Sequence, residues 1–172
     1  PRDFLYFYFG TFIGGGLVLN GQLFTGRTGN AAGVGPMPVQ GADGKLRRLI
    51  DVASLSILAQ RMETAGLDAS ALWETPEHWD IPPLILADWV HSAAEGLASA
   101  TLSAASLLEI GAVVIDGWVP PEIRSAITRE TNAALDRLDL AGITRPMIIE
   151  GTVGSDARAL GAAAIPLSQR YM

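Results

Sequence analysis

The sequence predicts an α/β fold with a mixed sheet flanked by helices. The N-terminal part joins a continuous apolar run to a two-residue hairpin turn, a pattern typical of antiparallel strands. Further along, helical apolar spacing alternates with short runs of Val and Ile, as in βα units. With 172 residues, 49% of them apolar, the chain fits one domain with a core large enough for stability.

The opening segment predicts a three-stranded meander. Residues 4–9 (FLYFYF) are continuously apolar, which suits a strand covered on both faces. A glycine-rich connection leads to a second strand at 17–19. Asn20-Gly21 then supplies the positive backbone angles of a tight turn into a third strand near 22–25.

A long loop and a helix follow the meander. Residues 26–44 are rich in Gly, Pro and Asn, and loops of this length are often functional. A helix is expected next, ending at Gly66, because five apolar residues fall at helical spacing: Leu46, Leu49, Ile50, Ala53 and Ile57. Residues 68–83 contain three prolines and favour an irregular connection.

The C-terminal half predicts alternating helices and strands. A long helix over 84–110 is crowded with Ala, Ser and Gly, so we expect it to be central and a candidate two-fold interface, with the Trp-bearing segment before it. The remaining elements are a strand at 112–115, a helix from Pro120-Pro121 to 138, a strand at 147–149, a turn at 151–154 and a last helix at 156–164 with Ser155 as its N-cap. The predicted order is therefore βββαα-βα-βα.

Composition excludes several classes of function. The net charge is −6, so this segment is not expected to bind DNA by itself, and the basic cluster of Lys45, Arg47 and Arg48 is interpreted as a solvated helix start. The absence of cysteine excludes disulfides and thiolate zinc sites. The apolar segments are interrupted before they reach membrane-spanning length, and the N-terminal run lacks the features of a signal peptide, so we expect a cytoplasmic protein with no membrane partner.

A few polar and aromatic residues need both a structural and a functional interpretation. Asp116 ends a buried strand, where carboxylates sometimes serve active sites, but we favour a turn or cap role. His78 and His91 are far apart and lack a metal-ligand pattern, so no metal site is predicted. The four tryptophans are interpreted as packing or interface residues: Trp73, Trp79, Trp89 and Trp118.

Four segments carry a resemblance to the ROK family (repressors, open reading frames and sugar kinases). FGTFIGGGLVLNGQLFTG (9–26) resembles the family's GTGIGGGLVLNGxLxxG, and GNAAGVGPMPV (29–39) resembles GNAGEIGHMPV. EIGAVVIDG (109–117) resembles PExIVIGG, and GTVGSDARALGAAAIPL (151–167) is similar to the nucleotide-side segment ending in LGAA. The resemblance implies a ribonuclease-H-like lobe of the actin-like ATPase superfamily, with residues 1–172 forming a single C-terminal lobe of a longer protein.

On the phosphate side, the resemblance places a remnant of the phosphate loop at Gly10, Thr11, Phe12, Gly14 and Gly15. Family kinases have glycine at the position of Phe12, so its ring argues against ATP and the Mg²⁺ that accompanies it. The same resemblance makes Gly151 and Gly154 a remnant of the nucleotide-side loop. The alternative for residues 10–16 is a tight strand connection without a ligand.

On the sugar side, the resemblance points to Asn30, Gly33 and Pro36. Gly33 and Pro36 stand where the family has the glutamate and histidine that hydrogen-bond sugar hydroxyls, and neither has a side-chain donor or acceptor. The family's cysteine-rich zinc loop is replaced by residues 39–49, so no zinc is expected. The family's catalytic aspartate belongs to the upstream lobe, and no catalytic residue is assigned here.

The expected function is therefore the effector-sensing and dimerisation lobe of a sugar-responsive ROK regulator. Its expected partners are a sugar or sugar derivative, a second copy of the chain, and DNA only through an upstream winged-helix domain. A regulator tolerates the loss of catalytic groups because it needs only differential binding between two conformations. Two alternatives stay open: the C-terminal half of an ATP-dependent sugar kinase, and a structural or interaction lobe with no ligand.

Overall fold

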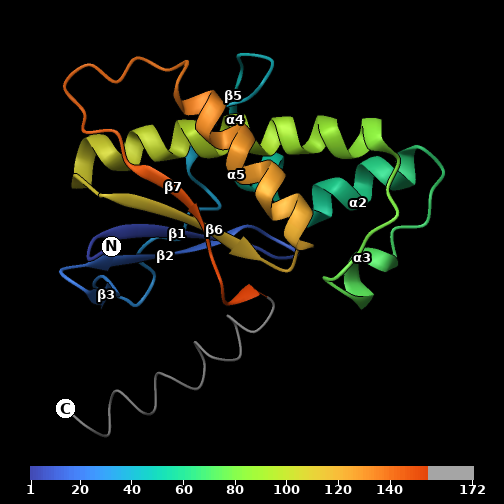
Figure 1. Cartoon of the computed structure of the whole chain (residues 1–172), viewed down its shortest axis with the longest axis horizontal. Helices are drawn as coiled ribbons and strands as arrows, with labels where there is room; N and C mark the ends of the chain where they lie inside the picture. Colours follow the sequence, from blue (N-terminus) through green and yellow to red (C-terminus); the bar gives the residue numbers. More distant parts are fainter. Residues whose placement is uncertain (155–172) are drawn as a thin grey trace, which may run out of the picture.

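The computed structural model describes residues 1–154, which form a five-stranded mixed sheet with helices packed on it and a separate two-stranded sheet (Figure 1). The strands of the larger sheet lie in the order β3-β2-β1-β6-β7. The first three are antiparallel, whereas β6 runs parallel to β1 and β7 parallel to β6. The strand bounds are β1 Phe4–Phe9, β2 Gly14–Leu19, β3 Gln22–Phe24, β6 Ala112–Gly117 and β7 Met147–Glu150.

The predicted meander is confirmed, and its turn follows the chemistry of the sequence. Asn20 and Gly21 have φ angles of 55° and 76°, the positive values that a two-residue hairpin turn requires. Strand β1 differs from the expectation in one respect. Its residues alternate between half-buried and buried, so its two faces are not equally covered, whereas β6 is buried throughout.

The helices differ in length and in role. The long α4 (Pro83–Leu108) and α5 (Pro121–Leu135) lie together on one side of the sheet (Figure 1). Each has proline as its first helical residue, where the missing N–H costs no hydrogen bond. Two short helices, α1 (Ile50–Ala53) and α3 (Ala71–Glu74), flank the α2 helix (Leu55–Thr64) along the chain. The predicted helices at 84–110 and 120–138 are thus confirmed with slightly different ends.

The helix predicted from Leu46 is wrong at its start. Residues Pro38–Gln40 (β4) and Leu46–Arg48 (β5) pair as an antiparallel hairpin, and the helical path begins only at Ile50. The turn between the strands is stabilised by Asp43, whose carboxylate accepts the Lys45 N–H at 3.1 Å and the Arg47 guanidinium at 2.7 Å. Leu46 follows the helical spacing but is 80% exposed, so its apolar side chain contributes nothing to a helical face.

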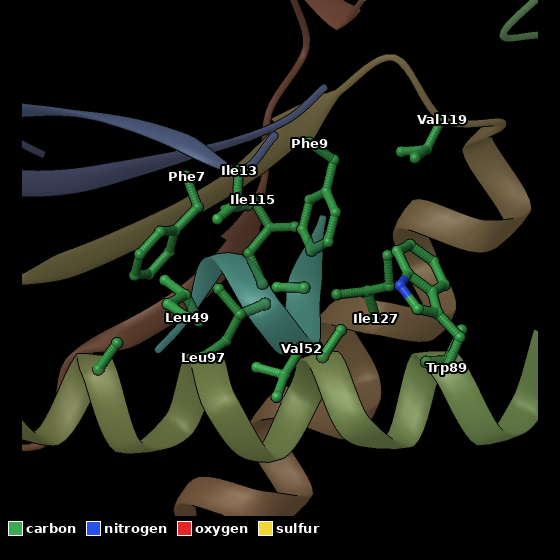
Figure 2. Close-up of a cluster of buried hydrophobic side chains, with 14 of the residues drawn as sticks. Phe7, Phe9, Ile13, Leu49, Val52, Trp89, Leu97, Ile115, Val119 and Ile127 are labelled. Carbon is green, nitrogen blue, oxygen red and sulfur yellow. The ribbon is translucent and has the colours of Figure 1, made fainter. Parts of the chain in front are cut away.

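The core lies between the sheet and α4, and small residues of α4 allow close packing there. A Cβ on Gly96 would lie 2.7 Å from Cγ2 of Val52, so α1 can approach α4 only because this position is glycine. Trp89 packs edge-on against Phe9 with ring centroids 5.7 Å apart (Figure 2). The small residues expected to be central are buried: Ala93, Ala94, Gly96, Ala98, Ala100, Ala104 and Ala105.

Three of the four tryptophans have the expected packing role. The indole N–H groups of Trp79, Trp89 and Trp118 donate to backbone carbonyls, and Trp79 and Trp89 are buried. Trp73 is 42% exposed. Within residues 1–154, none of the helices has the length and apolar character needed to cross a bilayer.

The last predicted helix at 156–164, its N-cap Ser155 and most of the segment 151–167 lie outside the described residues.

Candidate functional site

The glycine-rich turn after β1 is fastened to the junction of α1 and α2. The Ile13 N–H donates to Oγ of the buried Ser54 at 3.0 Å. The amides of Leu55 and Ser56 donate to the carbonyls of Gly10 and Thr11 at 3.2 and 3.1 Å. The turn is therefore held from the helix side by one bond to the Ser54 hydroxyl and two backbone hydrogen bonds.

Phe12 lies at the tip of this turn with 62% of its surface exposed. Its ring is thus a surface feature and is not packed into the core. Among the glycines around it, Gly15 has a clear packing reason, because a Cβ there would lie 2.8 Å from Val34 Cγ1 and 2.9 Å from the Ala32 carbonyl. Gly14 differs, since a Cβ there would meet no atom within 4 Å. The tight-connection interpretation therefore accounts for Gly15 but not for Gly14.

The three sugar-side positions line one groove. Asn30, Gly33 and Pro36 border a cavity of about 570 Å³ between the loop after β3 and the C-terminal half of α4. The loop is fastened to α1, because the amides of Leu49 and Ile50 each donate to a loop carbonyl at 2.9 Å. The other lining residues are Leu5, Leu17, Ala32, Val34, Met37, Ser103, Ala104, Leu107 and Leu108.

The groove is largely apolar. Asn30 carries the lining amide, and the Ser103 hydroxyl already donates to the Ser99 carbonyl at 3.1 Å. Its lining residues include no carboxylate and no imidazole in the part of the chain that the structure describes. Leu107, 81% exposed, forms part of the wall opposite the loop. The arrangement can hold a ligand through apolar contact and few hydrogen bonds.

The nucleotide-side glycines gather around Asp116 at the carboxyl end of β6. Its carboxylate accepts the backbone N–H groups of Gly117, Val153 and Gly154 at 2.9, 3.1 and 3.0 Å. A Cβ on Gly151 would lie 2.3 Å from Oδ2 of Asp116, so only glycine fits there. The predicted turn or cap role of Asp116 is confirmed.

Asp116 has two further partners. The Tyr6 hydroxyl donates to Oδ2 at 2.9 Å, and Nη1 of Arg124 lies 3.4 Å from Oδ1. Arg124 also places Nε 3.3 Å from Oε2 of Glu150. Burial, together with the hydrogen bond to Asp116 and its negative charge, raises the pKa of Tyr6. A smaller cavity of about 230 Å³ lies beside this cluster, lined by Gly117, Val119, Arg124, Gly154, Pro121, Pro76 and Glu77.

The structure brings the sugar-side positions together, and Gly15 of the phosphate-side segment packs against the same loop at Ala32 and Val34. Gly10, Thr11 and Phe12 do not line the groove that holds Asn30. His78 lies 3.7 Å from an exposed Glu122 carboxylate. Across residues 1–154, no group of three or more His, Cys, Asp or Glu side chains is placed to hold a metal.

Sequence reasoning missed the Ser54 anchor and the Arg124 partner of Asp116. Neither residue lies in a recognisable motif. Ser54 is 41 residues from Ile13 in the sequence, so no local pattern connects the two. Arg124 lies in the first turn of α5, which starts at Pro121, and β6 ends at Gly117. The short connection between β6 and α5 is the one signal that could have placed Arg124 near Asp116.

Comparison with known proteins shows the fold. No protein-family model matches the sequence, and no curated protein does either. Among solved structures, a ROK hexokinase from Thermus thermophilus has a TM-score of 0.66 at 23% identity, covering 95% of this chain and 57% of that one. A ROK family protein from Streptococcus pneumoniae TIGR4 in complex with sucrose has a TM-score of 0.73 at 20% identity, covering 98% and 59%.

A transcriptional regulator shares the fold as well. The ROK family regulator described as a homologue of the E. coli MLC protein has a TM-score of 0.62 at 18% identity, covering 87% of this chain and 42% of that one. This chain thus spans less than two thirds of the length of these structures. The predicted fold class, an α/β fold with a mixed sheet flanked by helices, is confirmed, and this chain shares its fold with part of each of these structures.

Proposed function

We propose that this chain is the C-terminal lobe of a ROK protein and serves as the effector-sensing and dimerisation half of a sugar-responsive transcriptional regulator. The supporting observation is the lining of the groove at Asn30, Gly33 and Pro36. It has room for a small molecule, yet its lining residues supply few side-chain hydrogen-bonding groups. Small-molecule sites commonly have volumes of roughly 300 to 1,000 Å³, so the size of the groove suits a sugar or a sugar derivative.

The chemistry of the groove favours sensing over catalysis. Phosphoryl transfer requires that sugar and nucleotide be fixed in line with high precision. A sensor requires only that its ligand bind one conformation better than another. A groove that holds its ligand by apolar contact and one amide meets the second requirement more readily than the first.

The second candidate is an ATP-dependent sugar kinase whose upstream lobe supplies the general base. It is supported by the similarity to the Thermus hexokinase and to a Streptomyces griseus ROK glucokinase in complex with glucose and AMPPNP. This candidate requires ATP to bind beside Phe12. The third candidate, a structural lobe without a ligand, requires that no sugar bind the groove.

Calorimetry on the full-length protein separates the three candidates. Pentoses, hexoses and Mg-ATP are titrated separately, and sugar phosphate is assayed in parallel. The regulator predicts binding of at least one sugar, no ATP binding and no sugar phosphate. Sugar phosphate formation would establish the kinase, and binding of neither class of ligand would leave the structural lobe.

Two variants connect the binding to the groove. Asn30→Ala removes the lining amide, so we expect sugar affinity to fall by about 1 to 3 kcal/mol. Gln22→Ala removes an exposed amide on β3, outside the groove lining, and serves as the matched control. Equal affinity in both variants would place the sugar elsewhere.

A further inference from the structure

Asp116 is a fully buried carboxylate that takes no part in the groove. A buried carboxylate is costly unless hydrogen bonds and opposite charge replace its water. Both oxygens of Asp116 have such partners. They accept the backbone N–H groups of Gly117, Val153 and Gly154 and the Tyr6 hydroxyl, and Arg124 supplies the positive charge.

The donors around Asp116 have the composition of an anion-binding site. Consecutive backbone N–H groups, here those of Val153 and Gly154, form a concave nest that favours anions. An arginine adds charge-assisted hydrogen bonding to carboxylate or phosphate oxygens. The backbone packs closely around the Asp116 carboxylate, and two glycines make this possible. A Cβ on Gly117 would lie 2.4 Å from the Phe9 carbonyl oxygen, and a Cβ on Gly151 would collide with the Asp116 side chain.

The nest is adjacent to open space. Gly117, Arg124 and Gly154 all line the cavity of about 230 Å³ described above. Glu77 also lines this cavity, and Glu150 lies against Arg124. Asp116 and Glu150 both lie against the Arg124 guanidinium, and Glu77 adds a third carboxylate to the cavity wall, so with Asp116 in place an external anion that entered the cavity would meet net negative charge.

We propose that Asp116 is an internal anion that fills a nest able to bind a small carboxylate or phosphate group, and that it thereby excludes anionic ligands from this end of the sheet. Asp116 is then a specificity-determining residue. Asp116 does not line the groove, so anion exclusion at the nest is independent of sugar binding in the groove.

Replacement of the side chain by an external anion tests the proposal in the full chain. Asp116→Ala removes one carboxylate group, and sodium formate supplies the same group in solution. We expect the variant to melt at a lower temperature than the wild type. Formate at about ten times its dissociation constant should then raise the Tm of the variant by about 3 to 6 °C and leave the wild type unchanged.

Inorganic phosphate is the second probe, at matched ionic strength with sodium chloride as reference. Stabilisation of Asp116→Ala by either anion supports the proposal, and the larger shift identifies the class of anion that the nest prefers. The matched control is Asp68→Ala, because Asp68 also accepts a backbone N–H, that of Ser70 at 2.9 Å, but does so at the surface. The proposal is overturned if the anions raise the Tm of Asp116→Ala no more than that of Asp68→Ala or of the wild type.

Asp116→Asn covers the case in which the alanine variant does not fold. The amide keeps the shape of the side chain but loses its charge and one acceptor oxygen. We expect hydrogen exchange at the Val153 and Gly154 amides to become at least about tenfold faster than in the wild type. Unchanged exchange at both amides would show that the carboxylate does not hold the nest.

Discussion

The groove at Asn30 and the cluster at Asp116 lie at different places on one lobe and use opposite chemistry. The groove has about 570 Å³ of space and few hydrogen-bonding side chains. The Asp116 cluster is dense in donors and acceptors, and they are bonded to one another. Space without polar groups allows a ligand to enter, whereas polar groups that are already satisfied stabilise the fold and leave little for a ligand.

The difference predicts where glycine is indispensable. Gly117 has a φ of 144°, and Gly117→Ala places a Cβ 2.4 Å from the Phe9 carbonyl oxygen. The atoms that it meets belong to the Phe9 backbone in β1, which cannot move aside without disturbing the sheet. We expect a loss of about 3 kcal/mol or more in the free energy of unfolding, measured by urea denaturation. This is the largest effect that the comparison predicts.

Gly14→Ala is the matched control for that substitution. The new methyl group would meet no atom within 4 Å, and the backbone there is not in the left-handed region. Its stability should change by less than about 1 kcal/mol in either direction. Similar losses in both variants would contradict the account of close packing at the end of β6.

The anchor of the glycine-rich turn gives the next effect. Ser54→Ala removes the oxygen that accepts the Ile13 N–H at 3.0 Å and leaves that buried amide unpaired. We expect a loss of about 1 to 3 kcal/mol in the free energy of unfolding. Ser56→Ala is the control, because the contact that Ser56 makes with the turn uses its backbone N–H. If Ser56→Ala were as damaging, the side chain of Ser54 would not be the anchor.

Polar side chains added to the groove should increase its affinity for a sugar. Gly33→Glu with Pro36→His supplies a carboxylate and an imidazole at the positions where the ROK family is expected to hold sugar hydroxyls. A Cβ on Gly33 would lie 3.4 Å from the nearest atoms, so the site tolerates a side chain. We expect hexose affinity, measured by calorimetry, to rise by about 1 to 2 kcal/mol. Unchanged affinity would mean that the sugar does not reach these positions.

The smallest effect is a pH dependence at Tyr6. Its pKa is raised above the ordinary value of 10.0, because burial and Asp116 both disfavour the phenolate. The contribution of the protonated Tyr6 hydroxyl to the free energy of unfolding is therefore fully present below pH 10. It is lost as the pH rises through the raised pKa of Tyr6 in the folded state. Urea midpoints should fall above pH 10 more steeply for the wild type than for Tyr6→Phe. Parallel profiles would exclude a role for this hydroxyl.

Local signals predicted most of the fold. The aromatic run of β1 and the Asn20-Gly21 turn each specify their structure within a few residues. The β4–β5 hairpin was missed, although Asp43-Gly44 is itself a turn signal, because Leu46 extended the helical spacing by one more apolar residue. Periodicity does not reveal whether an apolar side chain is buried, and Leu46 is exposed.

The candidate site was predictable only in part. The loop at 29–39 was expected to lie near a ligand, and its residues do line a groove. The opposite wall at Leu107 and Leu108 depends on where α4 crosses the loop, which no local pattern specifies. The partners of Asp116 were equally hidden, since Tyr6 lies 110 residues away in the sequence and meets it only through the parallel pairing of β1 with β6.

The most direct test of the contrast between the two regions is an NMR titration of the ¹⁵N-labelled full-length protein, first with pooled pentoses and hexoses and then with Mg-ATP. The account predicts that sugars shift the amides of Asn30 and Gly33, and that Mg-ATP leaves those of Gly117, Val153 and Gly154 unchanged. Saturable shifts at Gly117 and Gly154 on addition of Mg-ATP, with no response of the groove to any sugar, would contradict it.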